Sequence, residues 1–291
     1  MTRTPAPDAS RTTLAGLTLL MSGDSRGIGL AIALRAAQDG ANVVLLAKTA
    51  EPHPRLEGTV HTAAAQVQEA GGQALAVVGD VRNDDDVSRA VAAAVEWFGG
   101  LDIVVNNASA LDLRSTREID MKKYDLMQDI NARGTFLLAK TAIPHLERSA
   151  HAHVLTLSPP LGLRPKWAGS YLAYTVAKYG MSLVTLGLAE ELRDAGIAVN
   201  SLWPRTMIAT AAVANLLGGD QALASSRTPA IMADAAHAVL LRDPRTCTGQ
   251  FLLDEQVLAQ QGVTDLDRYR AVPGNGTLET DLFLDPLETG T

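Results

Sequence analysis

The sequence lacks the cysteine pairs typical of secreted proteins and the long apolar runs typical of membrane proteins. Its 291 residues include a single cysteine, Cys247, so no disulfide can form within the chain and a reducing compartment is the simpler expectation. No apolar run is long enough to span a bilayer, and the N-terminal stretch MTRTPAPDASRTT has no apolar core of signal-peptide length. We therefore expect a cytoplasmic protein without a membrane span.

Positive charge and aromatic side chains are scarce as well. The chain carries 25 Lys and Arg against 32 Asp and Glu, a net charge of −7, and no basic block that would neutralise nucleic-acid phosphates. His151 and His153 have no further ligands at a suitable spacing, so no metal site is expected. Aromatic residues make up 4% of the chain and hydrophobic residues 47%. This composition suits tightly packed layers of helices on a sheet, and the net charge argues against a nucleic-acid partner.

Short apolar runs alternate with longer helical stretches from residue 13 to residue 255. The apolar runs predict strands at 17–21, 42–47, 74–78, 102–106, 154–157, 197–202 and 250–254. Helices are expected at 29–37, 60–70, 84–98, 122–148 and 172–194. This alternation predicts an α/β fold, a single Rossmann-type domain with a doubly wound, parallel, seven-stranded sheet. Residues 1–12 are expected to form a disordered tail, and residues 256–291 an extension packed on the domain or on a neighbouring subunit.

The stretch SGDSRGIG, residues 22–29, has two interpretations. Gly23, Ser25 and Gly27 match the G-x-S-x-G nucleophile elbow of serine hydrolases. Gly23, Gly27 and Gly29 also form a glycine-rich turn between the first strand and the first helix, where a dinucleotide's phosphates can bind. The hydrolase interpretation is disfavoured, because no earlier strand and loop could supply the second oxyanion donor.

The end of the second predicted strand indicates which dinucleotide fits. An acidic residue at this point would bind the 2′-hydroxyl of NAD, but the chain has Lys48 and Thr49 there. Arg26, in the glycine turn, could approach the same place. Two cations and no carboxylate favour a 2′-phosphate and therefore NADP(H), although Lys48 could also be a solvated strand end.

Tyr174 and Lys178 form a Tyr-x-x-x-Lys pair on a predicted helix. Residues four apart share a helix face, so both side chains can point into one site. A free tyrosine titrates near 10, and a nearby ammonium stabilises the phenolate and is expected to lower the pKa of Tyr174 toward neutrality.

Taken in order, the glycine turn, Asn106-Asn107-Ala108, Asn131 and the Tyr-Lys pair resemble the short-chain dehydrogenase/reductases over residues 13–255. The resemblance implies that Tyr174 is the proton donor or acceptor, that Lys178 also binds the nicotinamide ribose, and that Asn131 supports a water in the proton relay. It also implies a homodimer or homotetramer packed through the long helices. The expected cofactor contacts are Gly23, Ser25, Arg26, Gly27, Ile28, Gly29, Lys48, Thr49, Asp80, Val81, Asn107, Ala108, Ser109, Tyr174, Lys178, Pro204, Thr206 and Ile208.

The resemblance is closer to the hydroxysteroid-dehydrogenase-like branch, on the stretches AKTAEPHPRLEGTVHTAA, LSPPL, AYTVAKYGM, LWPRTMIATAA and TDLFLDPL. Members of that branch are thought to act on lipid-like substrates. Two departures from the family pattern stand out. The catalytic serine is usually the second of a Ser-Ser pair, and the chain has Ser158-Pro159, so Ser158 or the nearby Ser170 would have to take its place. Arg205 follows Pro204 where glycine is customary.

These patterns predict hydride transfer between NADP(H) and a carbonyl or secondary alcohol of an apolar substrate. Tyr174 would donate the proton in reduction, and a hydroxyl such as that of Ser158 would stabilise the oxyanion. The apolar segment with Met207, Ile208, Leu216 and Leu217, ending at Gly218-Gly219, is either a lid or a surface helix, and Trp167 and Trp203 could line the pocket. An NADP-binding regulatory or scaffold protein with little catalysis is the alternative.

Overall fold

The computed structural model describes residues 11–52, 58–216, 219–274 and 276–286. Within them, seven parallel strands form one sheet in the order β3-β2-β1-β4-β5-β6-β7. The strands are β1 (Thr18–Ser22), β2 (Asn42–Ala47), β3 (Gln73–Val78), β4 (Ile103–Asn106), β5 (His153–Thr156), β6 (Ala198–Trp203) and β7 (Phe251–Leu253). The predicted Rossmann-type single domain is confirmed.

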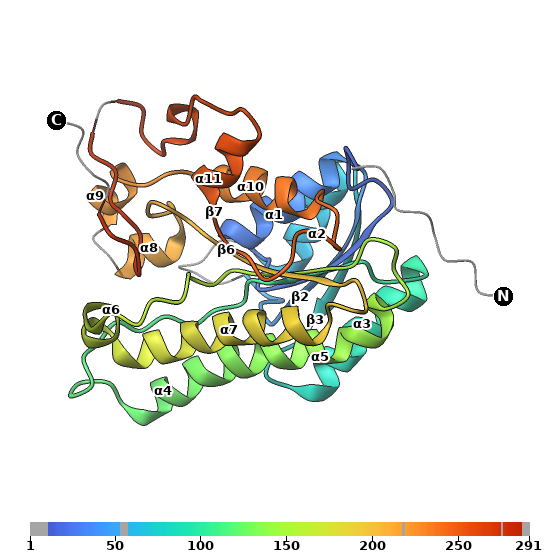
Figure 1. The fold of residues 1–291 in the computed structure, drawn as a ribbon, viewed down its shortest axis with the longest axis horizontal. Coiled ribbons are helices and arrows are strands. Elements are labelled where there is room, and N and C mark those ends of the chain that lie inside the picture. The colour runs from blue at the N-terminus through green and yellow to red at the C-terminus, as the bar shows by residue number, and fades with distance from the viewer. Residues whose placement is uncertain (1–10, 53–57, 217–218, 275, 287–291) are drawn as a thin grey trace.

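Helices cover both faces of the sheet (Figure 1). The helices are α1 (Gly27–Gln38), α2 (Val60–Glu69), α3 (Asp84–Phe98), α4 (Met121–Met127), α5 (Gly134–Leu146), α6 (Pro165–Ser170), α7 (Leu172–Glu191), α8 (Ala211–Leu216), α9 (Gly219–Ala224), α10 (Ala230–Leu240) and α11 (Asp254–Gln260). One core lies between the sheet and α1, α2, α10 and α11, and a second core lies under α3, α5 and α7. Strands buried on both faces explain why the apolar runs show no alternation.

Local sequence signals account for many of the helix ends. Helix α3 begins after Asn83, whose side chain accepts hydrogen bonds from the backbone N–H groups of Asp85 and Asp86. It ends at Gly99, which has a φ of 82°, in the left-handed region that glycine adopts without steric cost. The helix predicted at 122–148 is interrupted by a π-helical turn over Gln128–Arg133, between α4 and α5. Such turns are concentrated near functional sites.

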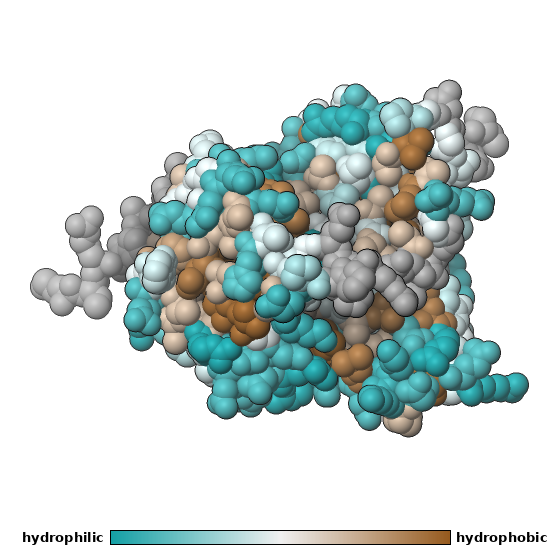
Figure 2. All heavy atoms as spheres, turned by 180° about the vertical axis from the view of Figure 1, so that it is seen from behind, coloured by the Kyte–Doolittle hydropathy of each residue, from teal (hydrophilic) through white to brown (hydrophobic). Residues whose placement is uncertain are grey.

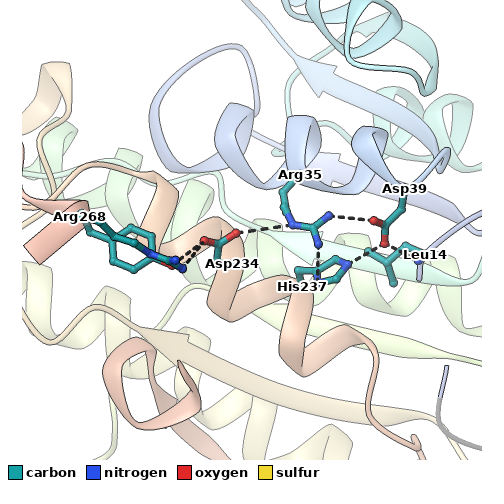
Figure 3. Close-up of polar contacts among 7 residues, drawn as sticks. Leu14, Arg35, Asp39, Asp234, His237 and Arg268 are labelled. Atoms are coloured by element: carbon teal, nitrogen blue, oxygen red, sulfur yellow. Dashed lines mark hydrogen bonds and ion pairs between the residues drawn. The ribbon is translucent and has the colours of Figure 1, made fainter. Parts of the chain in front are cut away.

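A polar network ties α1 to α10 and to the C-terminal extension (Figure 3). Asp39 accepts hydrogen bonds from Arg35 at 2.9 Å and from His237 at 2.7 Å. Burial raises the pKa of the Asp39 carboxyl, but His237, the Leu14 backbone N–H and Arg35 outweigh burial and lower the pKa overall. Tyr269, from the extension, donates to Asp234 on α10 at 2.6 Å. The extension is therefore joined to the helical layer beside α1.

The face opposite to that in Figure 1 has both hydrophilic and hydrophobic residues on its surface. In Figure 2 the apolar side chains of the described residues lie in small patches, separated by hydrophilic ones. Among the residues that the structure covers, no helix is long and apolar enough to cross a membrane.

Candidate active site

A cavity of about 1000 Å³ opens at the carboxyl ends of the strands. It lies where the strand order reverses between β1 and β4, which is the usual ligand site of a doubly wound sheet. Sixteen of the predicted site residues line the cavity: Gly23, Ser25, Arg26, Gly27, Ile28, Lys48, Thr49, Asp80, Val81, Asn107, Ala108, Ser109, Tyr174, Lys178, Pro204 and Ile208. Four predicted residues, Gly29, Asn131, Ser158 and Thr206, do not line it.

The glycine turn packs directly against the loop that follows β4. Gly23 has a φ of 72°, and a Cβ added there would lie 2.6 Å from the Cα of Ala108. A Cβ at Gly29 would lie 2.5 Å from Nδ2 of Asn107, which itself donates to the Gly23 carbonyl oxygen at 2.6 Å. Glycine is therefore required at both positions, and it leaves the N-terminus of α1 open toward the cavity. An open helix N-terminus of this kind is a binding site for phosphate.

Asp24, within the same turn, is fully buried. Neither of its carboxyl oxygens has a hydrogen-bond partner among the described residues. Burial raises the pKa of this carboxyl well above its usual range, and the nearby backbone N–H groups of Asp24 and Leu46, which do not reach hydrogen-bond geometry, oppose the shift only in part. The turn thus contains a neutral carboxylic acid under the expected phosphate site.

Two cations lie at the β2 end of the cavity. Lys48 is exposed, and the Arg26 guanidinium donates to the carbonyl oxygen of Gly58 at 3.0 Å. Asp80 also lines this end, where Arg82 binds its carboxylate at 2.7 Å. Arg82 is the main reason that the pKa of Asp80 is lowered, and Lys48 contributes to it. The negative charge of Asp80 is therefore neutralised within the protein, and Lys48 is left to face the cavity.

Helix α7 places Tyr174 and Lys178 on one buried face at the cavity wall, with 5% and 3% of their surfaces exposed. The Lys178 ammonium donates to the Leu157 carbonyl oxygen at 2.8 Å and lies 5.1 Å from the ring centroid of Trp203. The end of β5 and the end of β6 thereby fix the position of the lysine.

The expected lowering of the Tyr174 pKa is wrong for the chain without a cofactor. Burial raises the pKa of the Tyr174 phenol, the charge of Asp281 raises it further, and the nearby Ser109 hydroxyl acts in the opposite direction. Burial also lowers the pKa of Lys178 to about 7, while Asp281 opposes this shift. Desolvation outweighs the attraction between phenolate and ammonium, so Tyr174 stays protonated.

Ser158 is the first candidate for the catalytic serine, but its hydroxyl is directed away from the cavity, toward Ser201. The Ser158 hydroxyl is fully buried, 2.7 Å from the hydroxyl of Ser201, which donates to Thr185. Ser170, the other candidate, lies on α6 and donates to the carbonyl oxygen of Lys166. The structure brings neither serine into the cavity.

Asn131 and Thr206 also lie behind the residues that line the cavity. The buried Asn131 amide accepts from the Ala110 N–H at 2.7 Å and donates to the Ala110 carbonyl oxygen at 3.0 Å, which fixes the loop after β4. Thr206 is buried, pairs through its backbone with Thr280, and its hydroxyl has no hydrogen-bond partner within the described ranges. Arg205, whose backbone N–H donates to Asp254, does not line the cavity either.

The apolar segment after Pro204 borders the cavity through Met207, Thr210, Ala211 and Val213. Its helices α8 and α9 lie beside the C-terminal segment in Figure 1. Leu217 and Gly218 of the suggested lid fall outside the described residues. Trp203 lines this cavity, whereas Trp167 lines a second hollow of about 1240 Å³.

The sequence reasoning missed Asp281 and Leu282, which enter the cavity from the C-terminal extension. The stretch TDLFLDPL, residues 280–287, was a signal for them, since it contains an acid between apolar residues far from any predicted helix. It was used only as a marker of resemblance. Periodicity does not indicate where such a segment folds back.

Comparison with known proteins agrees with this geometry. The family model described as short chain dehydrogenase matches residues 18–219. The chain belongs to the short-chain dehydrogenase family. It is 55% identical over 272 residues to hydroxysteroid dehydrogenase-like protein 2 of Xenopus tropicalis, a match that covers 94% of this chain and 64% of the relative. The chain thus spans under two thirds of that relative's length.

Two solved structures are similar to this short-chain dehydrogenase over nearly its whole length. A candidate dehydrogenase from Xanthomonas campestris is 56% identical with a TM-score of 0.91, covering 94% of this chain and all of the other. A short chain dehydrogenase from Mycobacterium thermoresistibile is also 56% identical, with a TM-score of 0.89, covering 96% of this chain and all of the other. The predicted family and its hydroxysteroid-dehydrogenase-like branch are therefore confirmed.

Proposed function

We propose that the protein is an NADP(H)-dependent oxidoreductase that interconverts a carbonyl group and a secondary alcohol on an apolar substrate. One observation carries the proposal: Tyr174 and Lys178 share a single cavity with the open glycine turn. A short-chain dehydrogenase needs the proton-transferring tyrosine beside the nicotinamide, and this cavity can hold both.

The residues present fit a dinucleotide. Substituting either Gly23 or Gly29 would fill the space between the turn and the β4 loop, and the N-terminus of α1 is free of acidic side chains in its first turn. Lys48 and Arg26 at the β2 end favour the extra 2′-phosphate of NADP, because no carboxylate follows β2 to bind a 2′-hydroxyl. Asn107, Ser109, Pro204 and Ile208 would border the nicotinamide half.

In this proposal Tyr174 and Lys178 have different roles in the reaction. The bound nicotinamide supplies or accepts the hydride. Tyr174, which burial keeps protonated, donates its phenol proton to the substrate oxygen in reduction and becomes a phenolate, and in the reverse direction that phenolate takes the proton back from the alcohol. Lys178 lies behind the tyrosine and binds the nicotinamide ribose. With a pKa of about 7, its side chain can release a proton as the ammonium and take one up as the neutral amine near neutral pH.

The cavity wall indicates an apolar substrate. Leu111, Trp203, Met207 and Leu282 line the cavity, and all but Met207 pack in one apolar cluster with Tyr174. Burial of apolar substrate surface against such side chains would provide most of the binding free energy, at about 25 cal/mol per Å². A small number of polar groups would then orient the reacting oxygen.

Cofactor titration and a matched tyrosine pair test the proposal. NADPH should bind more tightly than NADH in a fluorescence titration, and binding of neither would refute it. On a panel of apolar ketones, Tyr174→Phe should lower kcat by roughly 100-fold or more without weakening NADPH binding. The control is Tyr124→Phe, on α4, which removes a phenol hydroxyl outside the cavity and should leave kcat unchanged. Turnover that survives Tyr174→Phe would disprove the mechanism.

The alternative of an NADP-binding protein with little catalysis is favoured by one observation, the Ser158 hydroxyl bound to Ser201. NADPH binding without turnover on the same panel would select it. A serine hydrolase is not proposed, because no histidine of the described residues lines the cavity beside Ser25.

We further propose a homodimer, or a homotetramer built from it, packed through α5 and α7. These helices expose large apolar side chains, among them Phe136 at 50%, Leu183 at 58% and Leu186 at 48%. Sedimentation of Leu183→Glu as a monomer, where the parent is an oligomer, would support this interface, and an unchanged mass would refute it. The cytoplasmic location stays a prediction that imaging of a tagged chain can test.

A further inference from the structure

The C-terminal segment, residues 278–285, forms part of the active-site cavity wall through Asp281 and Leu282 and is held by hydrogen bonds to the backbone. The Met207 N–H donates to the Glu279 carbonyl oxygen at 2.9 Å, and the Asp281 N–H donates to the Arg205 carbonyl oxygen at 3.2 Å. The Trp203 indole N–H donates to the Leu282 carbonyl oxygen at 3.0 Å. The segment is thus fixed to the end of β6 on both sides of Asp281.

The same segment is anchored by a buried aromatic ring. Phe283 is 6% exposed, and its ring centroid lies 6.0 Å from that of Tyr174, 5.4 Å from that of Tyr179 and 6.0 Å from that of Trp203. Its φ of 68° makes it the one residue other than glycine with positive φ within the described part of the chain. Backbone strain of this kind is retained where surrounding packing holds it, often at functional sites.

Asp281 lies where the segment meets the active site. It lines the active-site cavity together with Tyr174 and Lys178, and it also lines the second hollow. From this position its charge acts on both Tyr174 and Lys178, so the carboxyl lies near the catalytic pair.

The charged groups around Asp281 come from several elements. Burial raises the pKa of the Asp281 carboxyl to about 8. The carboxylates of Asp254, on α11, and Glu279 raise it as well, whereas the Leu282 backbone N–H and the Lys178 ammonium act in the opposite direction. The side chain is partly exposed, since it lines both cavities, and the raised pKa favours its protonated form near neutral pH. In that form the carboxyl has a proton that it can donate to a hydrogen bond.

The active site has room for such a donor, because the serine hydroxyl of the family pattern is absent from it. Pro159 occupies the usual position, and the Ser158 hydroxyl is bound to Ser201 at 2.7 Å behind the wall. The Ser109 hydroxyl, from the loop after β4, is also near Tyr174 and is the competing candidate for such a donor.

We propose that Asp281 is a catalytic residue, the second hydrogen-bond donor to the substrate oxygen, in the part that a serine hydroxyl plays elsewhere in the family. Asp281 keeps its proton throughout, and the proton that the substrate oxygen gains in reduction comes from the Tyr174 phenol. The carboxyl stabilises the negative charge that develops on that oxygen. This inference rests on the proposed oxidoreductase function.

Two substitutions at Asp281 and one at Asp285 test the proposal in the full chain with NADPH and 9,10-phenanthrenequinone, an apolar aromatic diketone. Asp281→Ala should lower kcat by about 100-fold, whereas Asp281→Asn, which keeps an N–H donor, should stay within about 10-fold of the parent. Asp285→Asn is the matched control. It loosens the same segment by removing the ion pairs with Arg164 and Lys166, and it leaves the Asp281 carboxyl in place.

The pH profile separates a donor from a structural role. Turnover by the parent should fall as the pH rises through about 8, because the ionised carboxylate no longer donates, and Asp281→Asn should not show this fall. An equal loss in Asp285→Asn, or a kcat of Asp281→Ala near that of the parent, would overturn the proposal. A loss in Ser109→Ala without one in Asp281→Ala would overturn it too and assign the donor to Ser109.

Infrared spectroscopy gives a readout that does not depend on turnover. At pH 7 the difference spectrum between the parent and Asp281→Asn should contain the carbonyl stretch of a protonated carboxyl, and this band should disappear at alkaline pH. Its absence at pH 7 would overturn the proposal. If NADPH does not bind and the diketone is not reduced, the oxidoreductase function fails. The infrared band still decides whether Asp281 is a neutral donor.

Discussion

The buried Asp24 allows a prediction about stability that is independent of catalysis. Its carboxyl is fully buried, and both oxygens lack hydrogen-bond partners in the part of the chain that the structure describes. An unsatisfied buried polar group costs about 1–3 kcal/mol. Asp24→Ala should therefore increase the free energy of unfolding at pH 7 by about 1–2 kcal/mol, after allowing for the small space left by the side chain.

The sign of the pH dependence follows from the raised pKa of Asp24. Below the unfolded-state value of about 3.9 the carboxyl is protonated in both states, and its ionisation adds no penalty. As the pH rises above this value, the unfolded chain loses the proton but the folded chain keeps it, so folding becomes progressively less favourable. The gain from Asp24→Ala should therefore be larger at pH 7.5 than at pH 4.5.

Urea denaturation at pH 4.5 and pH 7.5 measures both effects. Asp24→Asn should remove the pH dependence but gain less stability, because its amide is still buried. Asp125→Asn removes the same charge from an exposed position on α4 and should change the free energy of unfolding by less than about 0.5 kcal/mol. A destabilised Asp24→Ala, or a gain that does not depend on pH, would show that Asp24 has partners when the protein is in solution.

Two further predictions concern the cofactor and the helical layer. Lys48→Ala should weaken NADPH binding by about 10-fold in a fluorescence titration and leave NADH binding unchanged, since only the 2′-phosphate would lose its cation; equal losses for both would contradict the NADP assignment. His237→Leu should reduce the free energy of unfolding by about 1–2 kcal/mol at pH 7, because Asp39 loses the hydrogen bond that the His237 imidazole donates to it. The lowered pKa of Asp39 means that this contribution is present above about pH 4 and is lost as the pH falls through the folded-state pKa, so a difference that stays constant down to pH 3 would be evidence against it.

The sheet was predictable from the sequence because each strand is a short apolar run between turn residues. Strand β2 was expected at 42–47 and spans Asn42–Ala47, and α3 was expected at 84–98 and spans Asp84–Phe98. The π-helical turn at Gln128–Arg133 could not be predicted, because its cause is not a local preference. There the buried Asn131 side chain holds the Ala110 backbone, a contact between residues 21 positions apart.

The candidate site was predictable where its residues lie next to a strand or on one helix face. Gly23, Lys48 and Tyr174 line the cavity as expected, since the carboxyl ends of parallel strands meet at one edge. Ser158 also follows a strand, but the direction of its hydroxyl depends on Ser201 of the neighbouring strand, and one strand's sequence does not contain that information. The pKa of Tyr174 was mispredicted for a related reason, since the depth of burial is set by the whole fold.

Phe283 explains how the C-terminal segment stays in place and why its docking and the chemistry should be coupled. A φ of 68° costs a residue of this size about 1–3 kcal/mol. Burial of the ring contributes about 1.5–3 kcal/mol, and each well-placed aromatic pair adds about 0.5–1.5 kcal/mol, so the contacts with Tyr174, Tyr179 and Trp203 offset the strain. These favourable contributions all come from the ring. A change that removes the ring would therefore release the backbone two residues after Asp281, and the active site would lose the carboxyl without any substitution at the carboxyl itself.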